Sequence, residues 1–235
     1  MKKILIYLPY TWPTISTRFF KSFLELTRYP IPDTQVDVCI SNTFPLDRNR
    51  NEMCDRVANA TKYQADYLLM VDGDNILPPD ALERLLEHCS DEYPVVSGLY
   101  FRKTPPYKAV PGHYGEWEKH ETMRGTIESM GFVDKNGEQC LMYQPVKDFD
   151  TIQQIDVAGC GCLLVRTDVF AKLEQPFFRY HNPYTLGGDF SLDHTSEEME
   201  FFCKLRKAEI KTLLVPTVRA GHEVLRVIGC IENGN

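Results

Sequence analysis

The sequence predicts an α/β fold with a central, mostly parallel β-sheet flanked by helices. Two observations support this fold class. Short apolar runs with strand character recur along the chain, and segments with helical spacing of apolar residues lie between them. Strands that alternate with helices usually form a parallel sheet covered on both faces. The 235 residues are enough for one large domain, so we expect residues 1–235 to form a single one.

The apolar runs give the expected strands. They lie at residues 4–8, 36–40, 67–71, 95–101, 162–165 and 212–215. The run at 67–71, YLLMV, is almost entirely apolar, which is typical of a strand that is buried on both faces. We therefore expect this strand at the centre of the sheet.

The expected helices show apolar residues at three- and four-residue spacing. These residues are Ile15, Phe19, Phe23 and Leu26 in the first helix, Met53, Val57 and Ala60 in the second, and Leu82, Leu85, Leu86 and Cys89 in the third. The second follows the polar run DRNRN at 47–51, and the third opens at Pro78-Pro79-Asp80. Proline is tolerated in a first helical turn, and an aspartate there favours the positive end of the helix dipole.

The region from 102 to 150 has a different character. Prolines at 105, 106 and 111 interrupt regular structure, and Asn136-Gly137 is a hairpin turn signal. We expect an inserted loop and hairpin region here, and no separate domain.

Composition limits the functional classes. The net charge of −7 argues against broad binding to nucleic acid or to an anionic membrane. The eight cysteines contain no CxxC pair, which favours reduced thiols and a cytoplasmic location. The apolar run after Met1-Lys2-Lys3 is too short for a signal peptide or a membrane span. We therefore expect a cytoplasmic protein that does not cross a membrane.

Two aspartates follow the expected central strand at once, in the sequence DGDN at 72–75. Ligands in open α/β sheets bind at the carboxyl ends of strands, where Asp72 and Asp74 would stand. Two like charges on a tight turn are unfavourable unless a cation lies between them. A divalent cation such as Mn²⁺ or Mg²⁺ would satisfy both carboxylates. The alternative is a solvated Asp-Gly turn without a ligand.

A second enzyme class also places DxD after a strand. Haloacid-dehalogenase-type phosphatases have this motif together with a later GDxxxD, which Gly188-Asp189 and Asp193 would match. Asn75, however, stands where that class usually has threonine or valine, and its DxD strand tends to lie near the start of the fold. This phosphatase is the alternative enzyme hypothesis.

The order of the motifs resembles a known family. A strand followed by DGDN, a helix after PPDAL and a strand with VVSGLYF resembles the nucleotide-sugar half of GT-A fold glycosyltransferases, particularly family-2-like and small viral or bacterial members. ILIYLPY resembles their first strand and nucleotide loop, and DRNRN their helix start near the donor. DVAGCGCLLVRTDVF and TSEEMEFFCKLRKAEIKTLLVP resemble their later segments. The resemblance covers most of the chain.

This resemblance implies a metal-dependent transferase that uses a nucleoside-diphosphate sugar, UDP- or GDP-linked, and an unknown glycan, lipid or protein acceptor. The donor half would be residues 1–101 and the acceptor-side half 102–235. Mn²⁺ (or Mg²⁺) would bind to Asp72, Asp74 and His222. The implied donor-binding residues are Pro9, Tyr10, Thr11, Arg48, Arg50, Asp72, Gly73, Gly159 and Gly161. The implied acceptor-binding residues are Tyr114, Trp117 and Asp189.

The catalytic pair departs from the family pattern. The usual Glu-Asp pair is Glu197-Glu198 here, with Glu198 in the place of the aspartate. Glu198 is the expected general base of an inverting transfer, with Glu197 beside it. Two alternatives stay open. Thr195 and Glu198 also form a capping-box pattern, and the departure would suit a binding protein for sugar nucleotides or glycans that has lost turnover.

Overall fold

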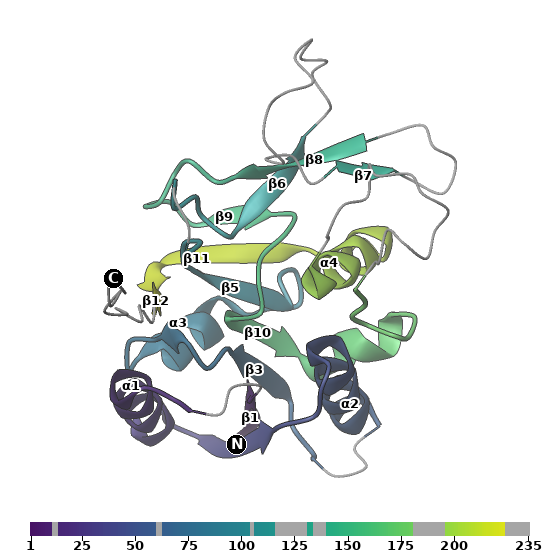
Figure 1. Cartoon of the computed structure of the whole chain (residues 1–235). Helices are drawn as coiled ribbons and strands as arrows, with labels where there is room; N and C mark the ends of the chain where they lie inside the picture. The colour runs from purple at the N-terminus through teal and green to yellow at the C-terminus, as the bar shows by residue number, and fades with distance from the viewer. Residues whose placement is uncertain are drawn as a thin grey trace, which may run out of the picture.

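The computed structural model describes residues 1–10, 14–59, 63–103, 106–115, 131–133, 140–180 and 196–223 (Figure 1). Its centre is a seven-stranded sheet with the order β2-β1-β3-β10-β5-β11-β9. These strands are β1 Lys2–Pro9, β2 Thr34–Ser41, β3 Tyr67–Val71, β5 Val95–Leu99, β9 Gln153–Ile155, β10 Cys162–Arg166 and β11 Thr212–Arg219. Only β9 and β10 run against the other five. The predicted α/β fold with a mostly parallel sheet is confirmed.

Strand β3 lies between β1 and β10, inside the sheet as predicted. Leu68 and Leu69 are fully buried, and Met70 and Val71 are each 1% exposed. Alternate side chains enter the hydrophobic cores on the two faces of the sheet. This double burial explains the unbroken apolar run that precedes the two aspartates.

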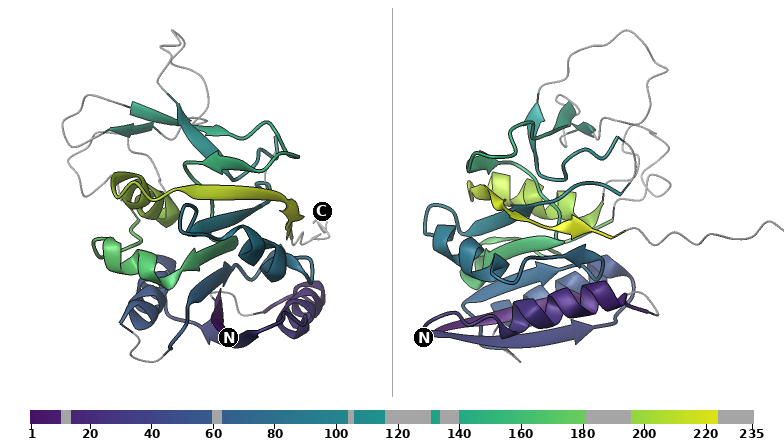
Figure 2. Two further views of the ribbon diagram at one scale, coloured as in Figure 1. Left: turned by 180° about the vertical axis from the view of Figure 1, so that it is seen from behind. Right: turned by 90° about the vertical axis from the view of Figure 1, so that its left-hand side faces the viewer.

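Helices cover both faces of the sheet (Figure 1). One core takes Phe19, Phe23 and Leu26 from α1 (Thr17–Arg28) and Leu82 and Leu85 from α3 (Ala81–His88). The core on the opposite face takes apolar side chains from α2 (Leu46–Ala58), the 3₁₀ helix η1 (Thr167–Lys172) and α4 (Glu197–Lys207). In Figure 2 the same two groups of helices lie on opposite sides of the strands.

Two helix starts differ from the sequence prediction. Helix α2 begins at Leu46, so the DRNRN run lies inside its first turns instead of before it. Helix α3 begins at Ala81, after both prolines, and its N-cap Asp80 makes no side-chain capping hydrogen bond. Asp80 instead pairs with Arg84, four residues later. Among the residues described, no helix is both long and apolar enough to cross a membrane.

The region at 102–150 contributes a separate three-stranded sheet with the order β6-β8-β7, drawn beyond β9 in Figure 1. Its strands are β6 Gly112–Gly115, β7 Gly131–Val133 and β8 Cys140–Pro145. β7 and β8 pair antiparallel, in register Val133↔Cys140. The predicted turn at Asn136-Gly137 lies between them and outside the described residues.

A short antiparallel pair joins two segments that are far apart in the sequence. β4 (Asn75–Ile76) follows the two aspartates directly and pairs with β12 (Gly221–His222), with His222 opposite Asn75. This pairing carries His222 to the carboxyl edge of the central sheet. Distant parts of the sequence therefore meet at the DGDN turn.

Candidate active site

The carboxyl ends of β1, β2 and β3 lie side by side. Pro9 is opposite Ser41 on β2, and the Tyr10 amide donates to the Ser41 carbonyl at 2.6 Å. Asp72 follows the last residue of β3, and the Asn75 amide donates to the Asp72 carbonyl at 3.0 Å, which closes the turn. Pro9 and Tyr10 are thus brought to the same edge as the aspartates. Thr11 lies outside the described residues.

Arg50 is the most unusual side chain at this edge, because a guanidinium is buried there with a side chain only 1% exposed. It forms ion pairs with three carboxylates. These are Asp72 at 2.8 Å, Glu198 at 3.0 Å and Glu197. Its Nε is buried without a partner among the residues described. One positive charge therefore joins the end of β3 to the start of α4.

The residues on either side of Arg50 fix its position. The side chain of Asn49 accepts from the Tyr7 hydroxyl at 2.5 Å and donates to the Ser41 carbonyl at 3.0 Å. Asn51 donates to the Phe178 carbonyl at 2.7 Å and accepts from the Phe178 amide at 2.9 Å. These four bonds hold the start of α2 against β1, β2 and the segment before α4, and they leave Arg50 pointing at the carboxylates.

The two predicted arginines have separate surroundings. Arg48 lies on the exposed side of α2 and pairs with Glu52 at 3.1 Å. Arg50 is enclosed by carboxylates. The resemblance implied that both bind the donor, and in the structure both have carboxylate partners. The polar run DRNRN is therefore mainly a framework for the site.

Glu197 and Glu198 open helix α4 after the N-cap residue Ser196. The Glu197 side chain is 3% exposed, whereas that of Glu198 is 16% exposed and reaches the surface of the site. Burial and the adjacent charge of Glu198 raise the pKa of Glu197 to about 7, against the attraction of Arg50. Burial also opposes the ionisation of Glu198, but the charge of Arg50 and a hydrogen bond with Ser196 lower its pKa overall. Glu198 is thus the more accessible member of the pair and the one whose pKa is lowered.

The capping-box alternative does not fit this helix start. A box between Thr195 and Glu198 requires Thr195 as the N-cap, but the N-cap is Ser196. Glu198 therefore stands one position too early for a box, and its side chain pairs with Arg50. Thr195 itself is outside the described part of the chain.

Asp74 has two nitrogen partners. Its Oδ2 forms an ion pair with the Lys103 ammonium, and its Oδ1 lies 3.5 Å from Nε2 of His222. Burial opposes the ionisation of Asp74, but its bonds to His222 and Lys103 lower its pKa overall. At Asp72 the balance is reversed, because burial raises the pKa more than Arg50 lowers it. The two carboxylates are similarly exposed, at 29% for Asp72 and 25% for Asp74, but Asp72 is held by a buried cation and Asp74 by a partly exposed one.

The imidazole of His222 is oriented as a metal ligand would be. Its Nδ1 lies 2.8 Å from the Phe101 carbonyl, which can only accept a hydrogen bond, so Nδ1 carries the proton. Nε2 is the nitrogen that faces the Asp74 carboxylate, and it is the one left to bind a metal ion when it carries no proton. Metal-binding histidines commonly have this arrangement, with the second nitrogen bonded to a backbone carbonyl.

These donors fit a divalent cation that also takes ligands from a substrate. Asp74 and His222 converge, and Asp72 follows β3 two residues earlier. Across the residues described, no group of three or more His, Cys, Asp or Glu side chains is spaced as a complete metal site. Mg²⁺ and Mn²⁺ commonly take their remaining ligands from water and substrate phosphates. The mixture of carboxylate and imidazole suits Mn²⁺ somewhat better than Mg²⁺.

The glycines at 159 and 161 leave room for the protein's own side chains. A Cβ at Gly159 would lie 1.9 Å from the Tyr100 hydroxyl, and one at Gly161 would lie 1.6 Å from Nδ2 of Asn75. The Gly161 amide also donates to the Tyr100 hydroxyl at 3.2 Å. Both polar atoms of the buried Asn75 amide have no partner among the described residues. Asn75 and Gly161 therefore pack closely beside Asp72.

Several expected residues are not placed. Trp117 and Asp189 lie outside the described residues, as do Gly188 and Asp193 of the phosphatase motif. Tyr114 is in β6, with only its backbone described. Sequence reasoning missed Lys103, Tyr100 and Asn75. The only sequence signal for them is their closeness to the ends of expected strands.

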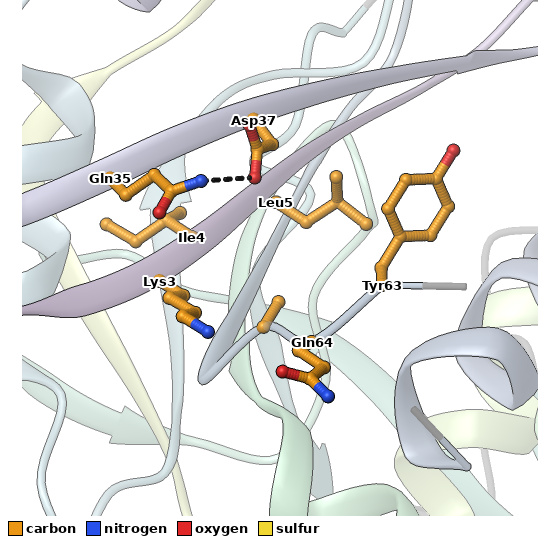
Figure 3. A pocket seen from close by; sticks show the side chains of 8 residues that line it. Lys3, Ile4, Leu5, Gln35, Asp37, Tyr63 and Gln64 are labelled. Atoms are coloured by element: carbon orange, nitrogen blue, oxygen red, sulfur yellow. Dashed lines mark hydrogen bonds between the residues drawn. The ribbon is translucent and has the colours of Figure 1, made fainter. Parts of the chain in front are cut away.

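A hollow of about 280 Å³ lies elsewhere on the protein, and Figure 3 shows the side chains that line it. Its lining comes from the amino-terminal parts of β1 and β2 and from the segment before β3. The lining residues are Lys3, Ile4, Leu5, Gln35, Asp37, Tyr63, Gln64 and Ala65. No expected site residue is among them, because they belong to the opposite edge of the sheet. We therefore place the candidate site at the DGDN edge.

Comparison with known proteins shows the fold but no family. The sequence matches no protein-family model and no curated protein. Among the solved structures that are similar to this chain are A197 from STIV and GalNAc-T7. A197 from STIV has a TM-score of 0.56 and 16% identity, and the match covers 95% of this chain and 86% of that chain. GalNAc-T7 with UDP, GalNAc and Mn²⁺ has a TM-score of 0.54 and 12% identity, and the match covers 99% of this chain and 45% of that chain. The chain thus spans less than half of that GalNAc-T7 chain. GalNAc-T7 is a GT-A fold glycosyltransferase, so the expected GT-A-like fold of this chain is confirmed.

Proposed function

We propose that this protein is a metal-dependent glycosyltransferase that transfers a sugar from a UDP- or GDP-sugar to a hydroxyl group of a glycan, lipid or protein. One observation carries the proposal. The carboxylate of Asp74 and the oriented imidazole of His222 lie at the same edge of the sheet as Glu198, which Arg50 joins to Asp72. The GT-A-like fold supports the same assignment, since GalNAc-T7 was solved with UDP, GalNAc and Mn²⁺.

In this proposal Asp72, Asp74 and His222 hold a divalent cation, preferably Mn²⁺. The cation would offset the negative charge that develops on the departing diphosphate. Pro9 and Tyr10, at the end of β1, lie where the nucleoside would bind. Gly73, in the turn between the aspartates, brings the backbone close to the same region. These assignments remain proposals for the donor half of the site.

Glu198 is the proposed general base. It would accept the proton of the acceptor hydroxyl as that oxygen attacks the sugar carbon in an inverting transfer. Its lowered pKa keeps it ionised at neutral pH, as a base must be. Glu197 is buried against Arg50 and would hold the start of α4 in place. The two neighbouring glutamates would thus have different tasks.

Binding of nucleotide sugars tests the donor side directly. We expect UDP- or GDP-sugars to raise the thermal midpoint only when Mn²⁺ or Mg²⁺ is present, because a ligand that binds the native state stabilises it. Asp74→Asn should remove this metal-dependent shift and leave the unliganded midpoint near the wild-type value. An equal shift in the presence of chelator would contradict metal dependence.

The other two hypotheses predict different results in the same assays. A haloacid-dehalogenase-type phosphatase would hydrolyse phosphate monoesters and lose that activity in Asp72→Asn. Yet Asp72 Oδ1, an oxygen of the aspartate that would be the nucleophile, is paired with Arg50 at 2.8 Å. A binding protein without turnover would show the thermal shift but would never release the nucleoside diphosphate.

A further inference from the structure

Lys103 is paired with Asp74, the aspartate to which the proposed metal would bind. Its ammonium pairs with Oδ2 of Asp74, while Nε2 of His222 faces Oδ1 of the same carboxylate. Both oxygens of Asp74 therefore have a nitrogen partner. The two nitrogens differ in chemistry: a neutral imidazole has a lone pair for a metal ion, but an ammonium group has none. A metal ion that binds to Asp74 can take His222 as a second ligand. The same metal ion must displace Lys103, because the ammonium cannot bind to it.

The surroundings of Lys103 permit this displacement. Its side chain is 35% exposed and that of Asp74 is 25% exposed, so the pair lies at the mouth of the site. A lysine has a flexible four-carbon stem and no fixed hydrogen-bonding fork. By contrast, the Arg50 side chain beside Asp72 is 1% exposed and has three carboxylate partners. Of the cations that the described residues place on the DGDN turn, Lys103 is the one free to exchange.

The same short segment also orients the histidine. Phe101 provides the carbonyl that bonds to Nδ1 of His222, and Lys103 follows two residues later. A displaced Lys103 ammonium therefore stays within reach of the site. The natural partner for it there is an anionic ligand, and the donor diphosphate of the proposed function is one.

We propose that Lys103 is a tethered counterion that holds Asp74 until the metal binds and then pairs with the diphosphate of the nucleotide. This inference rests on the proposed function. It implies that Mn²⁺ alone binds weakly because it must displace Lys103, and that nucleotide and metal strengthen each other's binding.

The test is calorimetric titration of Lys103→Met with Mn²⁺ alone, and then with UDP or GDP at saturating Mn²⁺. Without its competitor, Mn²⁺ should bind roughly two- to fivefold more tightly, which is the range expected for a partly exposed ion pair. The nucleotide should bind about tenfold more weakly, because a charge-assisted contact with phosphate is lost. Lys211→Met is the matched control. It removes the same charge from an exposed ion pair with Glu92 and should change neither affinity. Lys103→Arg keeps the charge, so it should not show the roughly tenfold loss of nucleotide affinity.

In Lys103→Met the affinity for Mn²⁺ should rise and the affinity for nucleotide should fall. These opposite changes distinguish the proposed role from a structural one. Weaker binding of both ligands in Lys103→Met, or unchanged Mn²⁺ affinity, would overturn the inference. So would metal-free binding of UDP or GDP that disappears in Lys103→Met, because the lysine would then replace the metal instead of competing with it. If neither nucleotide binds wild-type protein even with Mn²⁺, the proposed function fails, and the titrations with Mn²⁺ alone still test the displacement.

Discussion

The two aspartates of the DGDN turn are one residue apart and have opposite environments. Asp72 is paired with Arg50, whose side chain is 1% exposed and which also binds the two glutamates of α4. Asp74 is paired with Lys103 and faces His222, at the mouth of the site. The Asp72 side is a fixed, buried network, and the Asp74 side consists of partners that can exchange. A single motif thus combines a rigid anchor with a ligand-binding position.

This difference modifies the original argument for a metal. Two adjacent carboxylates require positive charge, and the sequence alone pointed to a divalent cation. In the structure the protein provides a cation for each aspartate. The need for charge therefore no longer argues for a metal by itself. The orientation of His222 favours a metal more strongly, because its Nε2 faces Asp74 while Nδ1 bonds to a backbone carbonyl.

Glu198→Gln should have the largest effect, because it removes the proposed general base while keeping the rest of the Arg50 network. Glutamine keeps the size of the side chain but cannot accept a proton. We expect transfer to slow by about 10²–10⁴-fold while donor binding survives. Steady-state rates with donor titrations would measure both. Near-normal transfer would exclude Glu198 as the base and would leave Glu197 or a retaining mechanism.

Arg50→Met tests whether the buried network is a structural anchor. The change leaves three carboxylates without their shared cation, so we expect a loss of about 3–5 kcal/mol in the free energy of unfolding. Arg48→Met, two residues earlier on the exposed side of α2, removes only a surface ion pair and should cost about 1 kcal/mol or less. Chemical denaturation of the two variants gives this comparison. Equal losses would show that burial of Arg50 is not what matters.

A smaller effect is expected from the glycine beside Asp72. In Gly161→Ala the new methyl group would meet Asn75 and Asp72, so we expect a loss of about 1–3 kcal/mol. A Cβ at Gly73, between the two aspartates, meets only Leu8 at 3.8 Å. Gly73→Ala should therefore change stability by about 1 kcal/mol or less. Thermal midpoints of the two variants would show the ranking, and a more damaging Gly73→Ala would contradict it.

Sequence patterns predicted the positions of the strands better than the partners of the side chains. The strand at 67–71 and the place of Asp72 and Asp74 at its end followed from burial alone, since only a central strand tolerates such an apolar run. The positions of Arg50 and Lys103 could not be predicted, because each side chain chooses its partner through tertiary packing. Arg50 meets Glu197 across 147 positions of sequence, and no local pattern reports such a pair.

The second half of the site shows the same limit. The resemblance placed His222 among the metal ligands, and the β4–β12 pairing does bring it opposite Asn75. The capping-box alternative for Glu198 failed because a shift of one residue in the helix start changes which side chain caps it. Helix boundaries depend on contacts beyond the local sequence, and Glu198 is held by Arg50 from another helix.

The central claim is that residues at the DGDN edge of the sheet catalyse sugar transfer from a nucleoside-diphosphate sugar. The most direct measurement is mass-spectrometric detection of UDP or GDP release from a panel of nucleotide sugars, with Mn²⁺ and a mixture of candidate acceptors, for wild type and Asp74→Asn. We predict release from at least one UDP- or GDP-sugar by the wild type, dependent on the divalent cation and lost in Asp74→Asn. Intact donors across the whole panel, or release that is equal in Asp74→Asn, would contradict the assignment.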